Sequence, residues 1–262
     1  MKRIISVLAV LVLALGVMSG CSNDKANKTD LEYVQDKGKL VVGITDFAPM
    51  DYQDENGEWI GFDADMAKAF AESLGVSVEF KVINWDYKIS ELDDKGIDCV
   101  WNGMTIGDEV LAGMEVSNAY CKNAQVVVVK EADADKYQTL DSVKELKFVV
   151  EAGSAGKDCA EENGFNFIEA ETQADTLLEV SSGTSEASII DLLMAGAMIG
   201  EGTDYAELTY TLSLTEEEYG VGFRKGSDLA AKLNEFFKTS YADGTMVKLA
   251  ETYGVQESVI AQ

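Results

Sequence analysis

Short apolar runs alternate with amphipathic segments from Leu40 to near the C-terminus. This alternation is typical of an α/β fold, in which strands and helices take turns along the chain. A strand is predicted for each uninterrupted apolar run, which gives residues 40–44, 76–83, 99–101, 125–129, 148–150 and 187–190.

Three helices are predicted from apolar side chains that recur at helical spacing. The first carries Met66, Phe70 and Leu74 on one face, with Asp63 as its expected N-cap and Gly75 after its end. Near the C-terminus the pattern predicts two more helices, one with Leu229, Leu233, Phe236 and Phe237, and one with Met246, Leu249 and Tyr253. The single proline, Pro49, is expected in the turn after the first strand.

Two segments, 119–130 and 212–223, place a polar patch beside a β-rich run. Such segments are expected where a strand passes from one lobe of a protein to another.

The N-terminal segment is predicted to direct export. Lys2 and Arg3 precede the uncharged run 4–17, which is shorter than the roughly 20 residues of a membrane-spanning helix. The following Ser19-Gly20-Cys21 resembles the bacterial lipobox, with Met18 where leucine is usual. The resemblance implies that residues 1–21 are the lipoprotein signal and lipobox and that the Cys21 thiol carries the lipid. Residues 22–30 read as a flexible tether. The protein is therefore expected outside the cytoplasm, lipid-anchored to the outer face of the cell membrane.

Composition excludes several kinds of site. The formal net charge of −26 argues against nucleic acid as a partner. Histidine is absent, so histidine general bases and histidine-ligated metals are excluded, and neither a metal nor a cofactor is expected. Cys99, Cys121 and Cys159 form no close pair, so buried free thiols are favoured, with one bridge left open.

Seven segments together resemble extracellular solute-binding protein family 3, the polar amino-acid binding proteins that feed ABC importers. They are VVGITDFAPM at 41–50, GFDADMAKAFAESLG at 61–75, NWDYKISEL at 84–92, GMTI at 103–106, VEAGSAG at 150–156, ASIID at 187–191 and EYGVGFRKGSDL at 218–229. The resemblance implies a type II periplasmic-binding-protein-like fold, with two α/β lobes joined by two hinge strands around a ligand cleft. Lobe 1 would comprise residues 31–123 and 214–262, and lobe 2 residues 124–213. It also implies a monomer whose partners are a small ligand and the membrane subunits of an importer.

Candidate ligand-binding residues follow the predicted strands, because ligands gather at the carboxyl ends of strands in open α/β sheets. The resemblance implies that Phe47 and Trp85 sandwich the ligand side chain, although ordinary core aromatics remain an alternative. It further implies that the Gly103 carbonyl accepts from the ligand ammonium and that the Thr105 hydroxyl donates to its carboxylate, where a plain turn is the alternative. Asp191 would hold the α-ammonium or, alternatively, cap the next helix.

The second lobe would contribute a Gly-rich turn that opens a helix, with Ser154 and the amide of Ala155 as donors. The complete predicted site is Asp46, Phe47, Trp85, Asn102, Gly103, Thr105, Glu151, Ser154, Ala155 and Asp191.

One position departs from the family: Val110 stands where an arginine should grip the ligand carboxylate. Either the ligand lacks an α-carboxylate, or amides near Gly107 replace the arginine together with Thr105, Ser154 and a cation such as Lys88 or Lys122. The acidic excess of Asp46, Glu151 and Asp191 favours a cationic ligand, to which Phe47, Trp85, Trp101 and Trp59 could add cation–π contacts.

The expected function is therefore capture of a polar or cationic amino acid by cleft closure, without catalysis. Three alternatives remain at this point. The ligand could be an amine that lacks an α-carboxylate. The protein could be a cyclohexadienyl-dehydratase-like enzyme on the same fold. It could also be a receptor ectodomain that signals through a separate partner.

Overall fold

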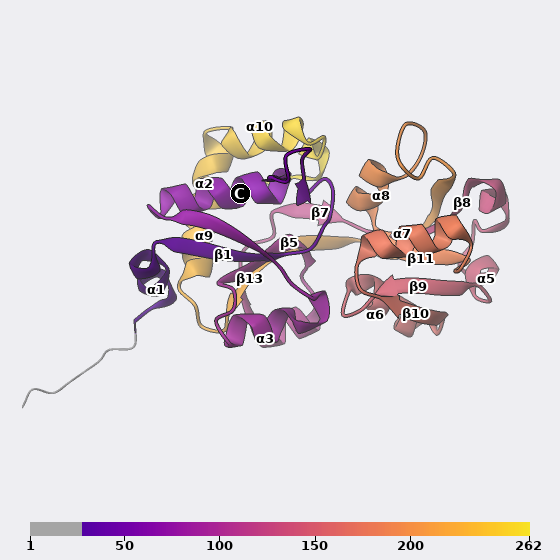
Figure 1. The fold of residues 1–262 in the computed structure, drawn as a ribbon, viewed down its shortest axis with the longest axis horizontal. Helices are drawn as coiled ribbons and strands as arrows, with labels where there is room; N and C mark the ends of the chain where they lie inside the picture. Colours follow the sequence, from indigo (N-terminus) through magenta and orange to yellow (C-terminus); the bar gives the residue numbers. More distant parts are fainter. Residues whose placement is uncertain (1–27) are drawn as a thin grey trace, which may run out of the picture.

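The computed structural model describes residues 28–262. The predicted signal, Cys21 and the tether up to residue 27 lie outside the described residues. Figure 1 shows two lobes side by side, each built on its own sheet with helices packed against it.

The first lobe is built on a sheet with the strand order β4-β1-β5-β13-β6, and β7 also pairs with β13. Its strands are β1 (Lys39–Ile44), β4 (Ser77–Val82), β5 (Cys99–Thr105), β6 (Met114–Val116), β7 (Cys121–Asn123) and β13 (Glu217–Arg224), with the small ribbon β2 (Tyr52–Gln53) and β3 (Trp59–Ile60) beside them. Its helices are α1 (Asp30–Lys37), α2 (Phe62–Ser73), α3 (Lys88–Asp93), α4 (Asp108–Gly113), α9 (Leu229–Ala242) and α10 (Thr245–Thr252), with the short turns η1 (Trp85–Tyr87) and η3 (Gln256–Ser258).

The second lobe is built on a sheet with the order β10-β9-β11-β8-β12. Its strands are β8 (Gln125–Lys130), β9 (Lys147–Glu151), β10 (Asn166–Ala170), β11 (Ala187–Asp191) and β12 (Leu208–Ser213). Its helices are α5 (Leu140–Val143), α6 (Ala155–Asn163), α7 (Gln173–Ser182) and α8 (Leu192–Met198), with the turn η2 (Glu131–Lys136).

The chain passes between the two sheets twice. It leaves the first sheet at Asn123 and enters the second at Gln125, then leaves the second at Ser213 and re-enters the first at Glu217. Glu217 pairs with Asn123 in antiparallel register, so the outgoing and returning segments lie side by side.

The six predicted strands and three predicted helices are present, but two details differ. Strand β5 extends to Thr105, because β13 pairs along it as far as the Tyr219 to Thr105 register. The prediction that Asp63 caps α2 is wrong, since Gly61 occupies the N-cap position. A Cβ on Gly61 would lie 2.1 Å from the carbonyl oxygen of Met50, so this close approach requires glycine.

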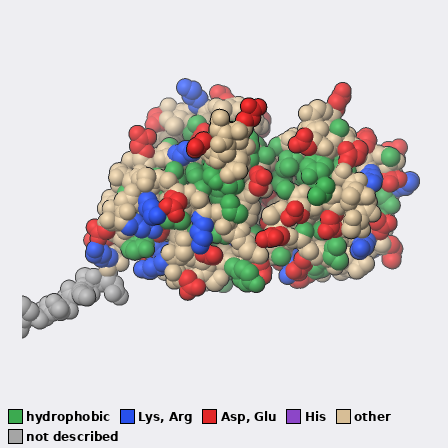
Figure 2. Space-filling model, viewed as in Figure 1, with side chains coloured by type: hydrophobic (Ala, Val, Ile, Leu, Met, Phe, Trp, Pro, Cys, Tyr) green, Lys and Arg blue, Asp and Glu red, His purple; other side chains and the backbone are tan. Residues whose placement is uncertain are grey.

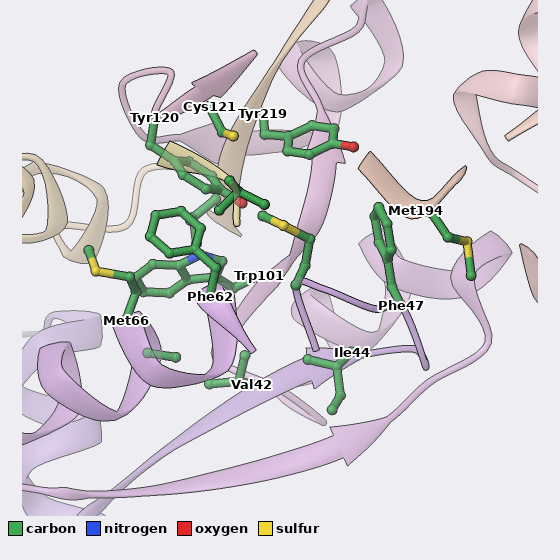
Figure 3. Close-up of a cluster of buried hydrophobic side chains, with 14 of the residues drawn as sticks. Val42, Ile44, Phe47, Phe62, Met66, Trp101, Tyr120, Cys121, Met194 and Tyr219 are labelled. Carbon is green, nitrogen blue, oxygen red and sulfur yellow. The ribbon is translucent and has the colours of Figure 1, made fainter. Parts of the chain in front are cut away.

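Trp101 lies in the aromatic core of the first lobe. It is fully buried, and its ring centroid lies 5.7 Å from that of Phe237 and 6.3 Å from that of Tyr120. Figure 3 labels Trp101 and Tyr120 in this cluster. The prediction of a cation–π role for Trp101 is therefore wrong. Trp59 lies in β3 and packs against the same core.

Cys99, Cys121 and Cys159 are buried free thiols, as favoured from the sequence. Within residues 28–262, no helix combines the length and the apolar character that a membrane span needs.

Candidate functional site

A cavity of about 70 Å³ lies between the lobes, and all ten predicted site residues line it. Acidic side chains gather near the boundary between the lobes in Figure 2. The structure thus brings together residues that are 145 positions apart in the chain, from Asp46 to Asp191.

Gly103 and Phe47 form part of the first-lobe wall. Gly103 adopts a φ of +54°, and a Cβ there would come within 2.5 Å of Phe47 Cε1 and 3.1 Å of Tyr219 Cε2. Glycine is required because the aromatic rings fill the space that a side chain would need. The Gly103 amide donates to Asp63 Oδ2 over 2.7 Å, which holds this turn against the start of α2.

Asn102 lines the cavity, but its side chain is fully engaged inside the protein. Its Oδ1 accepts from the amide and hydroxyl of Thr45, while its Nδ2 donates to the Thr45 carbonyl and to Asp51 Oδ2. A primary amide has two donors and two acceptor lone pairs, so none is left for a ligand. The geometry assigns Asn102 a positioning role, which differs from the predicted contact.

Asp191 is the best-anchored carboxylate of the cavity. Its Oδ1 accepts from Asn123 Nδ2 at 2.5 Å and from the Tyr219 hydroxyl at 2.6 Å, and its Oδ2 accepts from Gln173. The residue stands at the N-cap position of α8, but its side chain makes no capping hydrogen bond. Burial raises the pKa of Asp191 to about 7, and the charge of Glu217 acts in the same direction.

Glu217 links the two lobes at the returning crossing. Its Oε1 accepts from Thr105 of the first lobe at 3.0 Å, from Asn123 at 2.6 Å and from Gln125 of the second lobe at 2.8 Å. Asn123 donates to Asp191 as well, so a continuous network joins the cavity to both crossings. The hydroxyl proton of Thr105 is engaged with Glu217, in contrast to the predicted donation to a ligand carboxylate.

Glu151 ends β9 and is 2% exposed. Among the described residues, its Oε1 has no hydrogen-bond partner. The pKa of Glu151 is raised to about 8, chiefly by burial and then by the charge of Asp191. A buried carboxyl group without a partner is costly to ionise, and it strongly favours a donor or cation from outside the protein.

Lys88 is the lysine that lines the cavity. It is 4% exposed, its Nζ donates to the Gly153 carbonyl at 2.8 Å, and it lies 5.3 Å from the ring centre of Trp85. Burial lowers the pKa of Lys88, while nearby carboxylates, Glu109 first, act in the opposite direction. The other cation considered from the sequence, Lys122, is exposed on β7 and does not line the cavity.

The predicted donors of the second lobe begin α6. Ser154 is the N-cap of this helix, and its Oγ accepts from the Lys157 amide at 3.1 Å. The hydroxyl proton of Ser154 therefore remains available, as a hydroxyl can accept and donate at the same time. The cavity also reaches Ala155, the first residue of α6.

Val110 is 6% exposed and lines the cavity from α4. It puts an apolar surface in a cavity otherwise rich in acidic groups. Six carboxyl side chains and one ammonium line it, the carboxyls being Asp46, Asp108, Glu109, Glu151, Asp158 and Asp191.

Several lining residues were missed from the sequence. Gln173 begins α7 and reaches Asp191 from a neighbouring turn, and Asp158 lies one turn into α6. Helical spacing offered a signal for Asp158, since it follows Ala155 by three residues and so shares its face. No local pattern distinguishes Gln173 from a surface glutamine.

Comparison with known proteins identifies relatives among bacterial solute-binding proteins. Residues 40–256 match the family model described as bacterial extracellular solute-binding proteins, family 3. The L-cystine-binding protein TcyJ of Escherichia coli K12 is 28% identical over 247 residues, which cover 92% of each chain. The arginine-binding extracellular protein ArtP of Bacillus subtilis 168 is 28% identical, with 83% of this chain and 86% of that protein covered.

A solved structure extends the similarity to three dimensions. The ancestral amino acid-binding protein AncCDT-1, described as a precursor of cyclohexadienyl dehydratase, superposes with a TM-score of 0.78 at 32% identity. The alignment covers 85% of this chain and 98% of that one.

Proposed function

Because the chain belongs to the bacterial extracellular solute-binding proteins of family 3, we propose that it captures a polar or cationic amino acid, or a related amine, and delivers it to an ABC importer. The family match confirms the resemblance seen in the sequence motifs, and the similar structures confirm the two-lobed type II fold. In this proposal the protein acts as a monomer and does not catalyse a reaction. A lipid on Cys21 holds it at the outer face of the cell membrane.

The observation that carries this proposal is the cavity between the lobes. Residues from both lobes line it, and a network through Asn123 and Glu217 connects it to both crossings. A ligand that contacts both lobes stabilises their closed arrangement, which the importer can then distinguish from the open one. The excess of carboxyl groups favours a ligand with a net positive charge.

A ligand screen tests this function. The protein, purified after unfolding and refolding to remove bound molecules, is titrated calorimetrically with the standard amino acids and with simple diamines. We expect saturable binding of at least one member, strongest among the cationic ones. If none of them binds, and mass spectrometry of the natively purified protein finds no small organic ligand, the proposal is wrong.

An enzyme is the second candidate, because the Glu151 carboxyl group is a buried proton donor within the cavity, with a pKa of about 8. AncCDT-1 is related to an enzyme as well. Prolonged incubation of the protein with its bound ligand distinguishes the two functions. A binding protein returns the ligand unchanged, whereas a cyclohexadienyl-dehydratase-like enzyme would return a product lighter by at least one water.

A further inference from the structure

Glu151 is a buried acidic group whose Oε1 has no hydrogen-bond partner among residues 28–262. Burial and then the charge of Asp191 raise the pKa of Glu151, while Gln173 and Lys88 act to lower it. Its side chain lines the cavity at 2% exposure. No ion pair within 4.0 Å includes Glu151 among residues 28–262. Lys88 lies in the same cavity, but its Nζ donates to the carbonyl oxygens of Gly153 and Trp85.

Asp191 differs from Glu151 in this respect, because three side chains from two lobes donate to it. The two carboxyl groups therefore have separate environments, although they lie close together. They end β9 and β11, which are adjacent parallel strands in one sheet. The last pair between these strands joins Ser188 to Val149, so both carboxyl groups lie beyond it at the same edge of the sheet. Both line the cavity, where one small molecule can reach the two groups.

We propose that Glu151 forms a second cation subsite, and that the ligand therefore carries two cationic nitrogens, as in a basic amino acid or a short aliphatic diamine. This inference rests on the proposed function. Asp191 holds one nitrogen in its ordered network, and Glu151 accepts the other through its unpartnered Oε1. Trp85 and Phe47 contact the aliphatic part of the ligand between the two nitrogens.

The chemistry of the pocket favours a cation over a neutral donor at this point. A hydrogen bond to a charged group strengthens binding by about tenfold to a hundredfold over one that is not made. Because Glu151 is removed from water, replacing its lost hydration with an ammonium or guanidinium satisfies both partners.

A matched pair of ligands isolates this subsite. L-lysine and L-norleucine have the same backbone and chain length and differ in the terminal ammonium. Calorimetric titrations at pH 8 compare both with the wild-type protein and with Glu151→Gln, which keeps the side chain's size and removes its charge. We expect the wild type to bind L-lysine at least tenfold more tightly than L-norleucine, and Glu151→Gln to lose most of that preference.

The control is Glu162→Gln, an identical change at an exposed position of α6 outside the cavity. It should keep the wild-type preference. Equal binding of the two ligands by the wild type overturns the proposal, as does a Glu151→Gln protein that still prefers L-lysine. If L-lysine fails to bind, the same comparison uses L-arginine against L-citrulline and 1,5-diaminopentane against 1-aminopentane.

These outcomes distinguish a failure of the second subsite from a failure of the proposed function. If the wild-type protein binds neutral amino acids but no dication, the proposed function stands and the proposal of a second subsite is wrong. If the wild-type protein binds no amino acid and no amine, both the proposed function and the second subsite are wrong. Should Glu151→Gln fail to fold, the wild-type comparison of the paired ligands still decides whether a second cation is recognised.

Discussion

Lys88 donates from its ammonium to the carbonyl oxygen of Gly153 over 2.8 Å, and this hydrogen bond joins the two lobes across the cavity. Gly153 has a φ of +68°, and a Cβ there would lie 2.7 Å from Asp86 Cα. The turn before α6 thus approaches η1 too closely for a side chain. Lys88 and Gly153 together form a contact that exists only while the lobes are close.

Replacing Lys88 by methionine should weaken ligand binding by about tenfold to a hundredfold, because a hydrogen bond to a charged group contributes about 1.5 to 3 kcal/mol. Methionine retains most of the apolar stem that packs beside Trp85. Since the bond joins lobe to lobe, we expect equal losses for L-lysine and for 1,5-diaminopentane, measured by calorimetry. The exposed Lys122→Met serves as the control. A loss confined to L-lysine would instead assign Lys88 to the ligand carboxylate.

Substituting arginine for Val110 should favour ligands with an α-carboxylate. Val110 lines the cavity, and the new guanidinium would meet a carboxylate through two parallel hydrogen bonds. We expect at least a tenfold gain for α-amino acids over the amines that lack the carboxylate, seen in thermal shifts and titrations. Val110→Met, which adds bulk without charge, controls for filling the cavity. If the arginine variant gains nothing for α-amino acids, the ligand lies in a different orientation from that in the family.

Removing the carboxylate of Asp191 should abolish binding and also reduce stability. Asp191→Ala removes an acceptor from Asn123, Gln173 and Tyr219, of which Asn123 keeps a second acceptor in Glu217. Each unsatisfied buried group costs about 1 to 3 kcal/mol. We therefore expect a clear fall in the midpoint of thermal unfolding as well as a loss of binding. Asp191→Asn should lose binding with a smaller fall, because the amide oxygen still accepts. Wild-type affinity in either variant would remove Asp191 from the site.

The ligand-free protein should be more stable at pH 5 than at pH 8. Burial raises the pKa of Asp63 to about 7, although the Tyr120 hydroxyl and the Gly103 amide act to lower it. A carboxyl group whose pKa is raised by folding stabilises the protein fully below its unfolded pKa, and the effect is lost as the pH rises through the folded value. For Asp63 the loss falls between about pH 4 and 7.

Asp63→Asn tests this pH dependence. Its amide oxygen can still accept from Tyr120 and Gly103, while the ionisation is removed. The free energy of unfolding is measured with urea at pH 5 and at pH 8. The difference between the two pH values should be smaller in Asp63→Asn than in the wild type, by up to about 3 kcal/mol. Asp135→Asn, at an exposed position, should leave it unchanged. An equally steep pH dependence in Asp63→Asn would assign the effect to other buried carboxyl groups, such as Asp51 and Asp191.

Sequence patterns predicted the parts of the fold that are set by continuous burial. Runs such as 125–129 and 148–150 are buried on both faces, and this burial leaves a clear apolar signature. The short edge elements left weaker signals. Strand β6 has only three residues, and β10 lies at the edge of its sheet with a single partner strand. Both strands contain polar residues, and such short sequences are equally compatible with a loop.

The candidate site was predictable where it follows strand ends, as at Phe47 and Asp191. The hydrogen-bond partners were not, because they depend on contacts distant in sequence. Asn123 reaches Asp191 across 68 positions, and Thr105 reaches Glu217 across 112. Asp63 illustrates the same limit. Its place before an apolar helix indicates a cap, but donors 40 and 57 positions away engage its carboxylate instead.

The paired positions of Asn123 and Glu217 give the second lobe the character of an insert. The chain between them leaves and re-enters the first sheet at adjacent positions. The strand pairing of the first sheet therefore does not depend on the length of the segment between these two residues. The cavity-lining groups of this insert include Glu151, Ser154 and Asp191. Residues 125–213 should therefore be exchangeable between relatives as a unit. Such chimaeras should acquire the part of the donor's ligand preference that depends on these cavity-lining groups.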